Sequence, residues 1–78
     1  MTLEVSDREF QAIYDWIRSH TDPSPSRSRA ELSSMLYQNY CENTSHPIPQ
    51  NEWGLAMIEA GFPSFRFQGL RKRMLVLV

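Results

Sequence analysis

Residues 64–78 have the sequence SFRFQGLRKRMLVLV, and this stretch decides the fold. Phe65 and Phe67 alternate with polar residues, which is the two-residue period of a half-buried strand. Gly69 marks a turn, and the stretch ends in an apolar run of β-prone side chains. The pattern therefore predicts a β-hairpin over about residues 64–78, with its two strands joined around Gly69–Lys72.

The segment before the hairpin, PIPQNEWGLAMIEAGFP, predicts a helix over about residues 49–60. Pro49 suits the first helical position, where the N–H that proline lacks is not needed. Gly61 stands where a helix commonly ends in the left-handed conformation, and Pro63 prevents further helix. The helical period places four side chains on one inward face: Trp53, Ala56, Met57 and Ala60.

Two further helices are predicted in the N-terminal half of the chain. The first covers about residues 6–19, where Ser6 can cap the helix with Glu9 as its capping-box partner. Residues 20–28 (HTDPSPSRS) predict a loop because they contain two prolines, and Ser28 can cap a second helix over about residues 29–42. The apolar stripe of the first helix is formed by Phe10, Ile13, Tyr14 and Ile17, with Trp16 beside it.

These elements define the expected fold class, which is mainly α with a C-terminal β-hairpin. Three helices followed by a hairpin is the layout of a winged helix-turn-helix, in which the hairpin is the wing. The 78 residues are enough for one domain, so residues 1–78 are assigned to a single winged-helix domain.

Composition excludes several function classes. Cys41 is the only cysteine, which excludes an internal disulfide and suits a reducing cytoplasm. No apolar run reaches the length of a membrane span, and the first residues do not resemble a signal peptide. His20, His46 and Cys41 have no partners at catalytic or metal-ligand spacing, and the three glycines form no phosphate loop. We therefore expect a cytoplasmic protein that is not an enzyme and uses no metal or cofactor.

Charge is distributed unevenly, although the net charge is only −1. From Arg66 onward the chain has four positive residues and no acidic one, a distribution that fits either a surface facing a polyanion or an ordinary solvated hairpin. Gln50 and Asn51 begin the third predicted helix, where amide side chains can pair with an adenine edge and the helix terminus can bind a phosphate. The predicted contacts to double-stranded DNA are Gln50 and Asn51 on the helix, Arg66, Arg71, Lys72 and Arg73 on the wing, and Arg27 and Arg29 near the second helix.

The segment from Arg29 onward resembles the C-terminal winged-helix domain of phage, plasmid and poxvirus-type primase–helicases. It resembles the DNA-binding domain of the RFX transcription factors more distantly. The residues that carry the resemblance are Arg29, Glu31, Leu32, Tyr40-Cys41, Pro47-Ile48, Glu52-Trp53-Gly54, Met57, Gly61-Phe62, Gly69 and Arg71. The resemblance implies a small DNA-binding protein of a phage or another mobile element, acting in replication or in transcription control.

A second hypothesis comes from the positions where the chain departs from this family. In the family, basic or polar side chains are frequent just after the aromatic-glycine pair and at the exposed positions near the end of the third helix. This chain has Leu55, Ile58 and Glu59 at these positions. An exposed Leu55–Ile58 pair is typical of a protein contact. The alternative function is therefore an adaptor or inhibitor that uses the same fold to bind a protein partner or a second copy of itself through these two residues.

Overall fold

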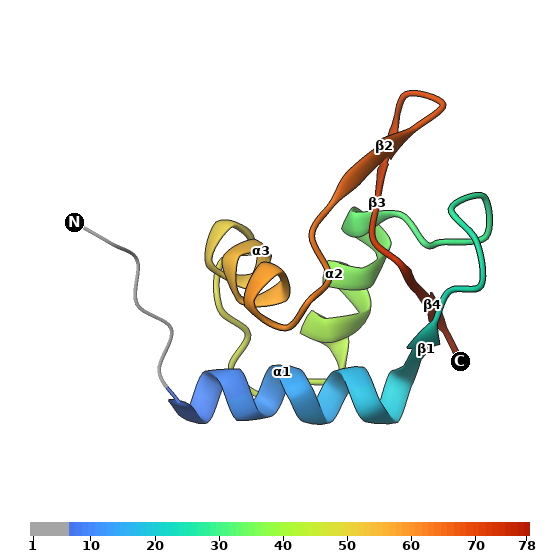
Figure 1. Cartoon of the computed structure of the whole chain (residues 1–78). Helices are drawn as coiled ribbons and strands as arrows, with labels where there is room; N and C mark the ends of the chain where they lie inside the picture. The colour runs from blue at the N-terminus through green and yellow to red at the C-terminus, as the bar shows by residue number, and fades with distance from the viewer. Residues whose placement is uncertain (1–6) are drawn as a thin grey trace.

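The structure is a computed structural model in which residues 7–78 are described (Figure 1). α1 lies along one side of the molecule, and α2, α3 and a hairpin of β2 and β3 lie on the other. The three predicted helices and the hairpin after them are confirmed. The elements described are α1 (Asp7–His20), β1 (Thr21–Pro23), α2 (Ser33–Glu42), α3 (Gln50–Glu59), β2 (Phe65–Phe67), β3 (Leu70–Lys72) and β4 (Leu75–Leu77).

α1 buries a face that differs slightly from the predicted stripe. Ile13 and Trp16 are buried, whereas Tyr14, which the stripe included, is 39% exposed. Trp16 turns inward because its indole Nε1 donates a hydrogen bond to Asn39 Oδ1 at 2.9 Å. Its ring also packs edge-on against Tyr40. The predicted cap at Ser6 lies outside the described residues.

The prediction of a continuous loop over residues 20–28 is wrong. Thr21–Pro23 form β1, which pairs antiparallel with β4 in the register Thr21↔Leu77. The Thr21 hydroxyl donates to the Ile17 carbonyl at 2.6 Å and so binds the strand to the end of α1. A strand of three residues that includes a proline has no periodic signal of its own, and its distant partner holds it in place.

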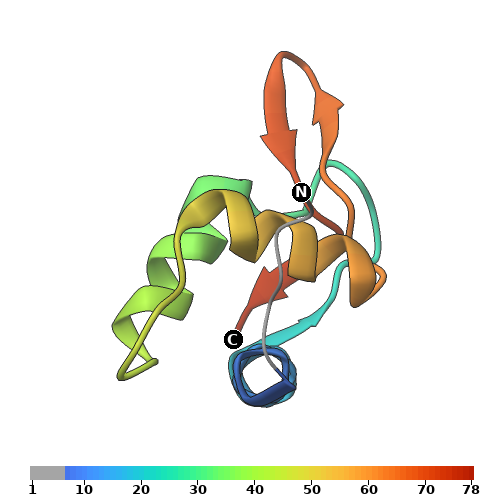
Figure 2. The same ribbon diagram turned by 90° about the vertical axis from the view of Figure 1, so that its left-hand side faces the viewer.

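The hairpin is shorter than the predicted span of residues 64–78. Its two strands are β2 and β3, and β4 leaves the hairpin to pair with β1 (Figure 2). The turn is Gln68-Gly69 rather than residues 69–72, and both turn residues have positive φ, 53° and 79°. Two positive φ angles define a type I′ turn, whose twist matches that of the flanking strands. Glycine accepts this conformation without steric cost.

α2 begins at Ser33, four residues later than predicted, and Ser28 does not cap it. Residues 27–30 form a turn, and the two residues that follow it, Glu31 and Leu32, pair with the C-terminal segment instead of joining the helix. The Glu31 N–H donates to the Leu75 carbonyl at 2.9 Å, and the Arg73 N–H donates to the Glu31 carbonyl at 3.2 Å. These hydrogen bonds to the C-terminal segment hold Glu31 outside the helix, so α2 cannot begin as early as the helical period allows.

α3 agrees closely with its predicted span. Trp53, Ala56 and Met57 are buried as expected, while Ala60 is half-buried at the C-terminal cap. Gly61 has φ of 96°, so the left-handed glycine is confirmed. The Phe62 N–H then donates to the Met57 carbonyl at 2.8 Å, which turns the chain back toward the core.

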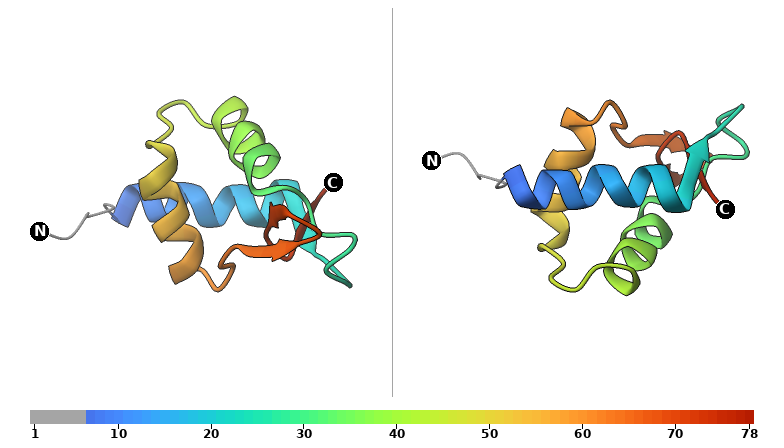
Figure 3. Two further views of the ribbon diagram at one scale, coloured as in Figure 1. Left: turned by 90° about the horizontal axis from the view of Figure 1, so that it is seen from above. Right: turned by 90° about the horizontal axis from the view of Figure 1, so that it is seen from below.

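The core fills the space between α1 and the two other helices. Views from above and below show α3 and the hairpin on one face and α1 on the opposite one (Figure 3). Trp53 is fully buried at the centre, where its ring contacts the rings of Trp16, Tyr37 and Tyr40 at centroid distances between 5.3 and 6.3 Å. The core residues are Ile13, Trp16, Leu36, Tyr40, Ile48, Trp53, Ala56, Met57 and Leu75.

Because Tyr40 is buried, the free energy of unfolding is expected to fall as the pH becomes alkaline. Burial raises the pKa of its hydroxyl above the ordinary value of 10.0, although the hydrogen bond from the Ile48 N–H acts in the opposite direction. A folded-state pKa above the unfolded value gives stability that is fully present below about pH 10 and is lost as the pH rises through the folded pKa. We expect the free energy of unfolding to fall more steeply in this range in the wild type than in Tyr40→Phe. Urea titrations from about pH 8 to about pH 11 measure this, and parallel pH profiles of the two proteins would contradict it.

Candidate nucleic-acid interface

The β2–β3 hairpin has two chemically different faces. Side chains alternate across a strand, so Phe65 and Phe67 lie on one face and Arg66 lies on the other. Arg66 stands directly opposite Arg71 in the antiparallel register, and both are exposed. Like charges in directly opposed positions destabilise a hairpin by up to about 1 kcal/mol. This pair therefore weakens the isolated protein, and an anion bound between the two guanidinium groups would remove the penalty.

A groove of about 460 Å³ lies between α3 and the base of the hairpin. It joins the first turn of α3, where Gln50 and Asn51 are exposed, to Arg71 on β3. The structure thus brings together four of the residues that the sequence assigned to DNA contact, namely Gln50, Asn51, Arg71 and the buried Arg73. The residues that line the groove are Ser33, Gln50, Asn51, Trp53, Gly54, Leu55, Ile58, Ser64, Arg71 and Arg73.

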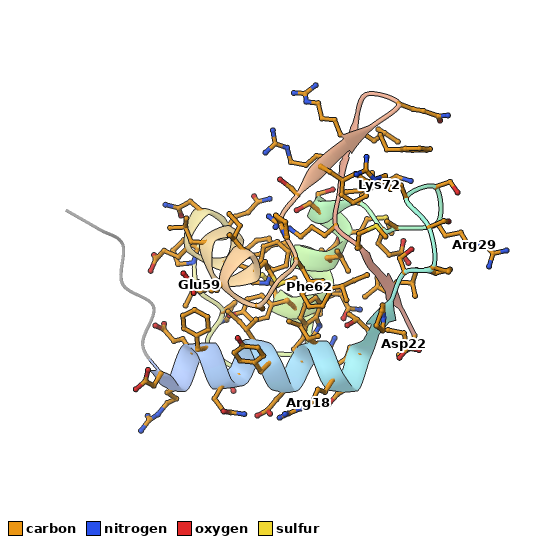
Figure 4. The ribbon with its side chains drawn as sticks, in the orientation of Figure 1. Arg18, Asp22, Arg29, Glu59, Phe62 and Lys72 are labelled. Atoms are coloured by element: carbon orange, nitrogen blue, oxygen red, sulfur yellow. The ribbon has the colours of Figure 1, made fainter. Side chains whose placement is uncertain are left out.

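Lys72 is not available on the surface, contrary to the prediction of a phosphate contact. It is only 9% exposed, and its Nζ donates to the Ser28 carbonyl at 3.0 Å. The same ammonium lies 5.1 Å from the centre of the Phe67 ring. Lys72 occupies the hairpin face opposite to Arg71, so its charge holds the hairpin against the loop that precedes α2 (Figure 4).

Arg73 is also buried, and the prediction that it contacts phosphate from the wing is corrected in the same way. Its Nε donates to the Ser33 hydroxyl at 3.0 Å, and its Nη1 donates to the Phe62 carbonyl at 2.7 Å. The guanidinium carbon lies 5.0 Å from the centre of the Trp53 ring. Burial, followed by the nearby charge of Arg71, lowers the pKa of Arg73 from its ordinary value. Arg73 lines the groove, and its hydrogen bonds connect Ser33, at the start of α2, to Phe62, which follows α3.

Arg27 and Arg29, which the sequence assigned to DNA contact near the second helix, lie apart from the groove. The Arg27 guanidinium lies 5.2 Å from the centre of the Phe65 ring, on the hairpin face opposite to Arg66. Arg29 extends from the loop before α2, on the side of the molecule far from Glu59 and α3 (Figure 4). The exposed cations of the hairpin and of the loop before α2 therefore form two groups, of which only Arg66 and Arg71 face the α3 side of the hairpin.

Leu55 and Ile58, the residues of the protein-binding hypothesis, line the same groove as Gln50 and Asn51. They are 43% and 53% exposed. The two acidic residues of α3, Glu52 and Glu59, are seven positions apart and share an edge of the helix outside the groove. Both functional hypotheses therefore concern one surface, and carboxylates do not line it.

The sequence did not reveal the roles of Ser33 and Ser64, which line the groove as polar groups. No periodic signal distinguishes such serines from ordinary surface residues. The sequence could have predicted that Arg66 and Arg71 stand opposite each other. Placing a two-residue turn at Gln68-Gly69 fixes the register of the hairpin and therefore this pairing. Gly54 belongs to the Glu52-Trp53-Gly54 motif, but the sequence did not show that it lies close to Arg73. A Cβ added at Gly54 would lie 3.4 Å from Arg73 Nη2, and this closeness depends on the tertiary fold.

Other candidate chemistry lies away from this groove. Two further hollows border α1 and the turn at residues 43–46, and they contain His20 and His46 respectively. Within residues 7–78, no three His, Cys, Asp or Glu side chains gather closely enough to hold a metal ion. No helix in this described part combines the length and apolarity needed to cross a membrane.

A scan of protein-family models, a search of curated proteins and a search of solved structures each found no match to this chain.

Proposed function

We propose that this protein is a winged helix-turn-helix module that binds double-stranded DNA. α2 and α3 form the helix-turn-helix, with α3 as the recognition helix, and the β2–β3 hairpin is the wing. The resemblance described from the sequence supports this proposal and suggests a role in replication or transcription control of a phage or another mobile element. The structural support is the position of the hairpin beside the first turn of α3.

The observation that carries the proposal is the exposed Arg66–Arg71 pair on the α3 side of the hairpin. Two guanidinium groups in opposed positions repel each other in the free protein, and each can donate two hydrogen bonds to a phosphate. DNA supplies phosphates along a continuous backbone, so both side chains can be satisfied in one complex. The unpaired N–H groups at the start of α3 attract a further phosphate through the helix dipole.

The division of work in the complex follows from this geometry. Arg66 and Arg71 contact the backbone and set the orientation of the protein, whereas Gln50 and Asn51 meet base edges in the major groove. Arg27, on the other hairpin face, reaches a phosphate only if DNA extends past the wing. The small number of exposed cations predicts a modest dependence of affinity on salt.

The double substitution Arg66→Thr/Arg71→Thr tests the proposal. Threonine favours strands, so the free energy of unfolding should stay equal or rise by a few tenths of a kcal/mol once the repulsion is gone. Binding should weaken to a similar degree on all duplex sequences. The slope of log K against log salt should fall by about 0.9 for each phosphate that the variant no longer neutralises. Fluorescence anisotropy with a labelled duplex across a salt series measures both quantities.

The matched control is Arg8→Ala/Arg18→Ala, which removes the same charge from the exposed surface of α1. α1 lies on the face opposite to α3 (Figure 3), so this variant should keep most of the wild-type affinity and slope. Equal losses of affinity and of salt slope in the two variants would mean that only net charge matters. The hairpin would then not be part of the DNA interface.

The alternative function, a protein-binding adaptor or inhibitor, is favoured by the exposure of Leu55 and Ile58. It predicts no duplex binding even at about 50 mM salt, where non-specific contacts are visible. In that case Leu55→Asp or Ile58→Asp should abolish the protein contact without unfolding the domain, because both side chains are exposed.

A further inference from the structure

The groove-facing side of α3 has an unusual composition for a surface beside two arginines. Its side chains are two amides, Gln50 and Asn51, and two branched aliphatic groups, Leu55 and Ile58. Gly54 adds no side chain between them. α3 contributes no lysine or arginine to the groove, and its glutamates lie on the edge outside it.

Each side chain on this face matches a feature of an A·T base pair in the major groove. An asparagine or glutamine amide pairs in bidentate fashion with N6 and N7 of adenine, and an aliphatic group packs against the C5-methyl of thymine. Guanine is recognised most often by arginine or lysine, and cytosine by a carboxylate. α3 places neither type in the groove, and the buried Arg73 is occupied by Ser33 and Phe62.

The spacing along α3 supports contact with adjacent base pairs. Asn51, Leu55 and Ile58 follow at i, i+4 and i+7, which places them in one row along the helix. At a rise of about 1.5 Å per residue the row extends about 10 Å, which is about three base pairs of duplex.

We propose that α3 recognises an A·T-rich segment of about three base pairs, with amide contacts to adenine at its N-terminal end and Leu55 and Ile58 against thymine methyl groups. This inference rests on the proposed DNA-binding function and specifies its target. It also gives the exposed Leu55–Ile58 pair a role in DNA binding that does not require a protein partner.

The test compares three duplexes of equal length and charge: one A·T-rich, one G·C-rich, and the A·T-rich one with every thymine replaced by uracil. Uracil lacks only the C5-methyl, so the third duplex keeps the phosphates and the hydrogen-bonding groups. The wild type should bind the A·T-rich duplex at least about 5-fold more tightly than the G·C-rich one, and it should lose affinity for the uracil duplex.

The variant Leu55→Ala/Ile58→Ala should bind the thymine and uracil duplexes equally, because the aliphatic groups that touch the methyl are already absent. Glu59→Ala, on the outer edge of the same helix, is the control and should keep the thymine preference of the wild type. A circular dichroism melt of each variant verifies that it is folded.

The outcomes separate the two proposals. Binding of all three duplexes with equal affinity, and a salt slope that still depends on Arg66 and Arg71, would overturn the A·T inference and leave the DNA-binding function standing. Loss of the thymine preference in Glu59→Ala as well would also overturn it. Failure to bind any duplex at about 50 mM salt would overturn both and assign Leu55 and Ile58 to a protein contact.

Discussion

Replacing Trp53 with alanine is expected to lower the free energy of unfolding by about 3–5 kcal/mol. Trp53 is fully buried, and its ring contacts three other aromatic rings and the guanidinium of Arg73. Small domains have a total stability of about 5 kcal/mol at the low end, so the variant should be largely unfolded at 37 °C. Urea denaturation followed by circular dichroism measures the change.

Trp53→Phe is the informative control for this prediction. The indole Nε1 is buried without a hydrogen-bond partner among the described residues, and phenylalanine removes this polar group while keeping an aromatic ring. The loss of stability should therefore be much smaller than with alanine. A Trp53→Ala protein that melts within a few degrees of the wild type would show that the indole is not the centre of the core.

Arg73→Met is expected to lower the free energy of unfolding by about 3 kcal/mol. The substitution keeps an unbranched apolar stem but removes the donors to Ser33 Oγ and the Phe62 carbonyl. A buried polar group left without its partner costs about 1–3 kcal/mol, and the cation–π interaction with the Trp53 ring disappears as well. Thermal and urea denaturation of the purified variant measure the effect.

Arg71→Met provides the comparison, because Arg71 is exposed two residues earlier and is expected to change stability by less than about 0.5 kcal/mol. If the protein binds DNA as proposed, the salt dependence of binding should respond in the opposite way, with the larger effect in Arg71→Met. Arg71→Met should lower the salt slope, whereas a folded fraction of Arg73→Met should keep it. Equal stability of Arg73→Met and the wild type would contradict the structural role of Arg73.

Helices were the part of the fold that the sequence predicted well. The spacing of Trp53, Ala56 and Met57, together with Gly61, determined α3 almost to its ends. These signals are local, because helical hydrogen bonds and the glycine C-terminus involve residues close together in the chain. The choice between Tyr14 and Trp16 was harder to make from the sequence, since it depends on Asn39 as a hydrogen-bond partner on another helix.

The strands were harder, because their partners lie far away in the chain. Pairing of residues 21–23 with β4 could not be inferred from three residues that include a proline. The late start of α2 has the same origin, since Glu31 is held extended by Leu75 and Arg73.

The candidate site was predicted in part. Gln50, Asn51 and Arg71 meet in the groove, but the run Arg71-Lys72-Arg73 is divided between three environments. The sequence shows that the three charges exist. It does not show that Lys72 and Arg73 are buried, because their hydrogen-bond acceptors belong to Ser28, Ser33 and Phe62, which are distant in the chain. A run of like charges therefore does not establish a continuous surface.

The pairing of β1 with β4 has a consequence for the order of folding. The type I′ hairpin and the three helices depend on local contacts, which form within microseconds in small chains. Joining Thr21 to Leu77 instead requires closure of a loop that contains α2, α3 and the hairpin, so its entropic cost precedes any gain. β4 should consequently join last, and substitutions in it should accelerate unfolding while leaving the refolding rate nearly unchanged.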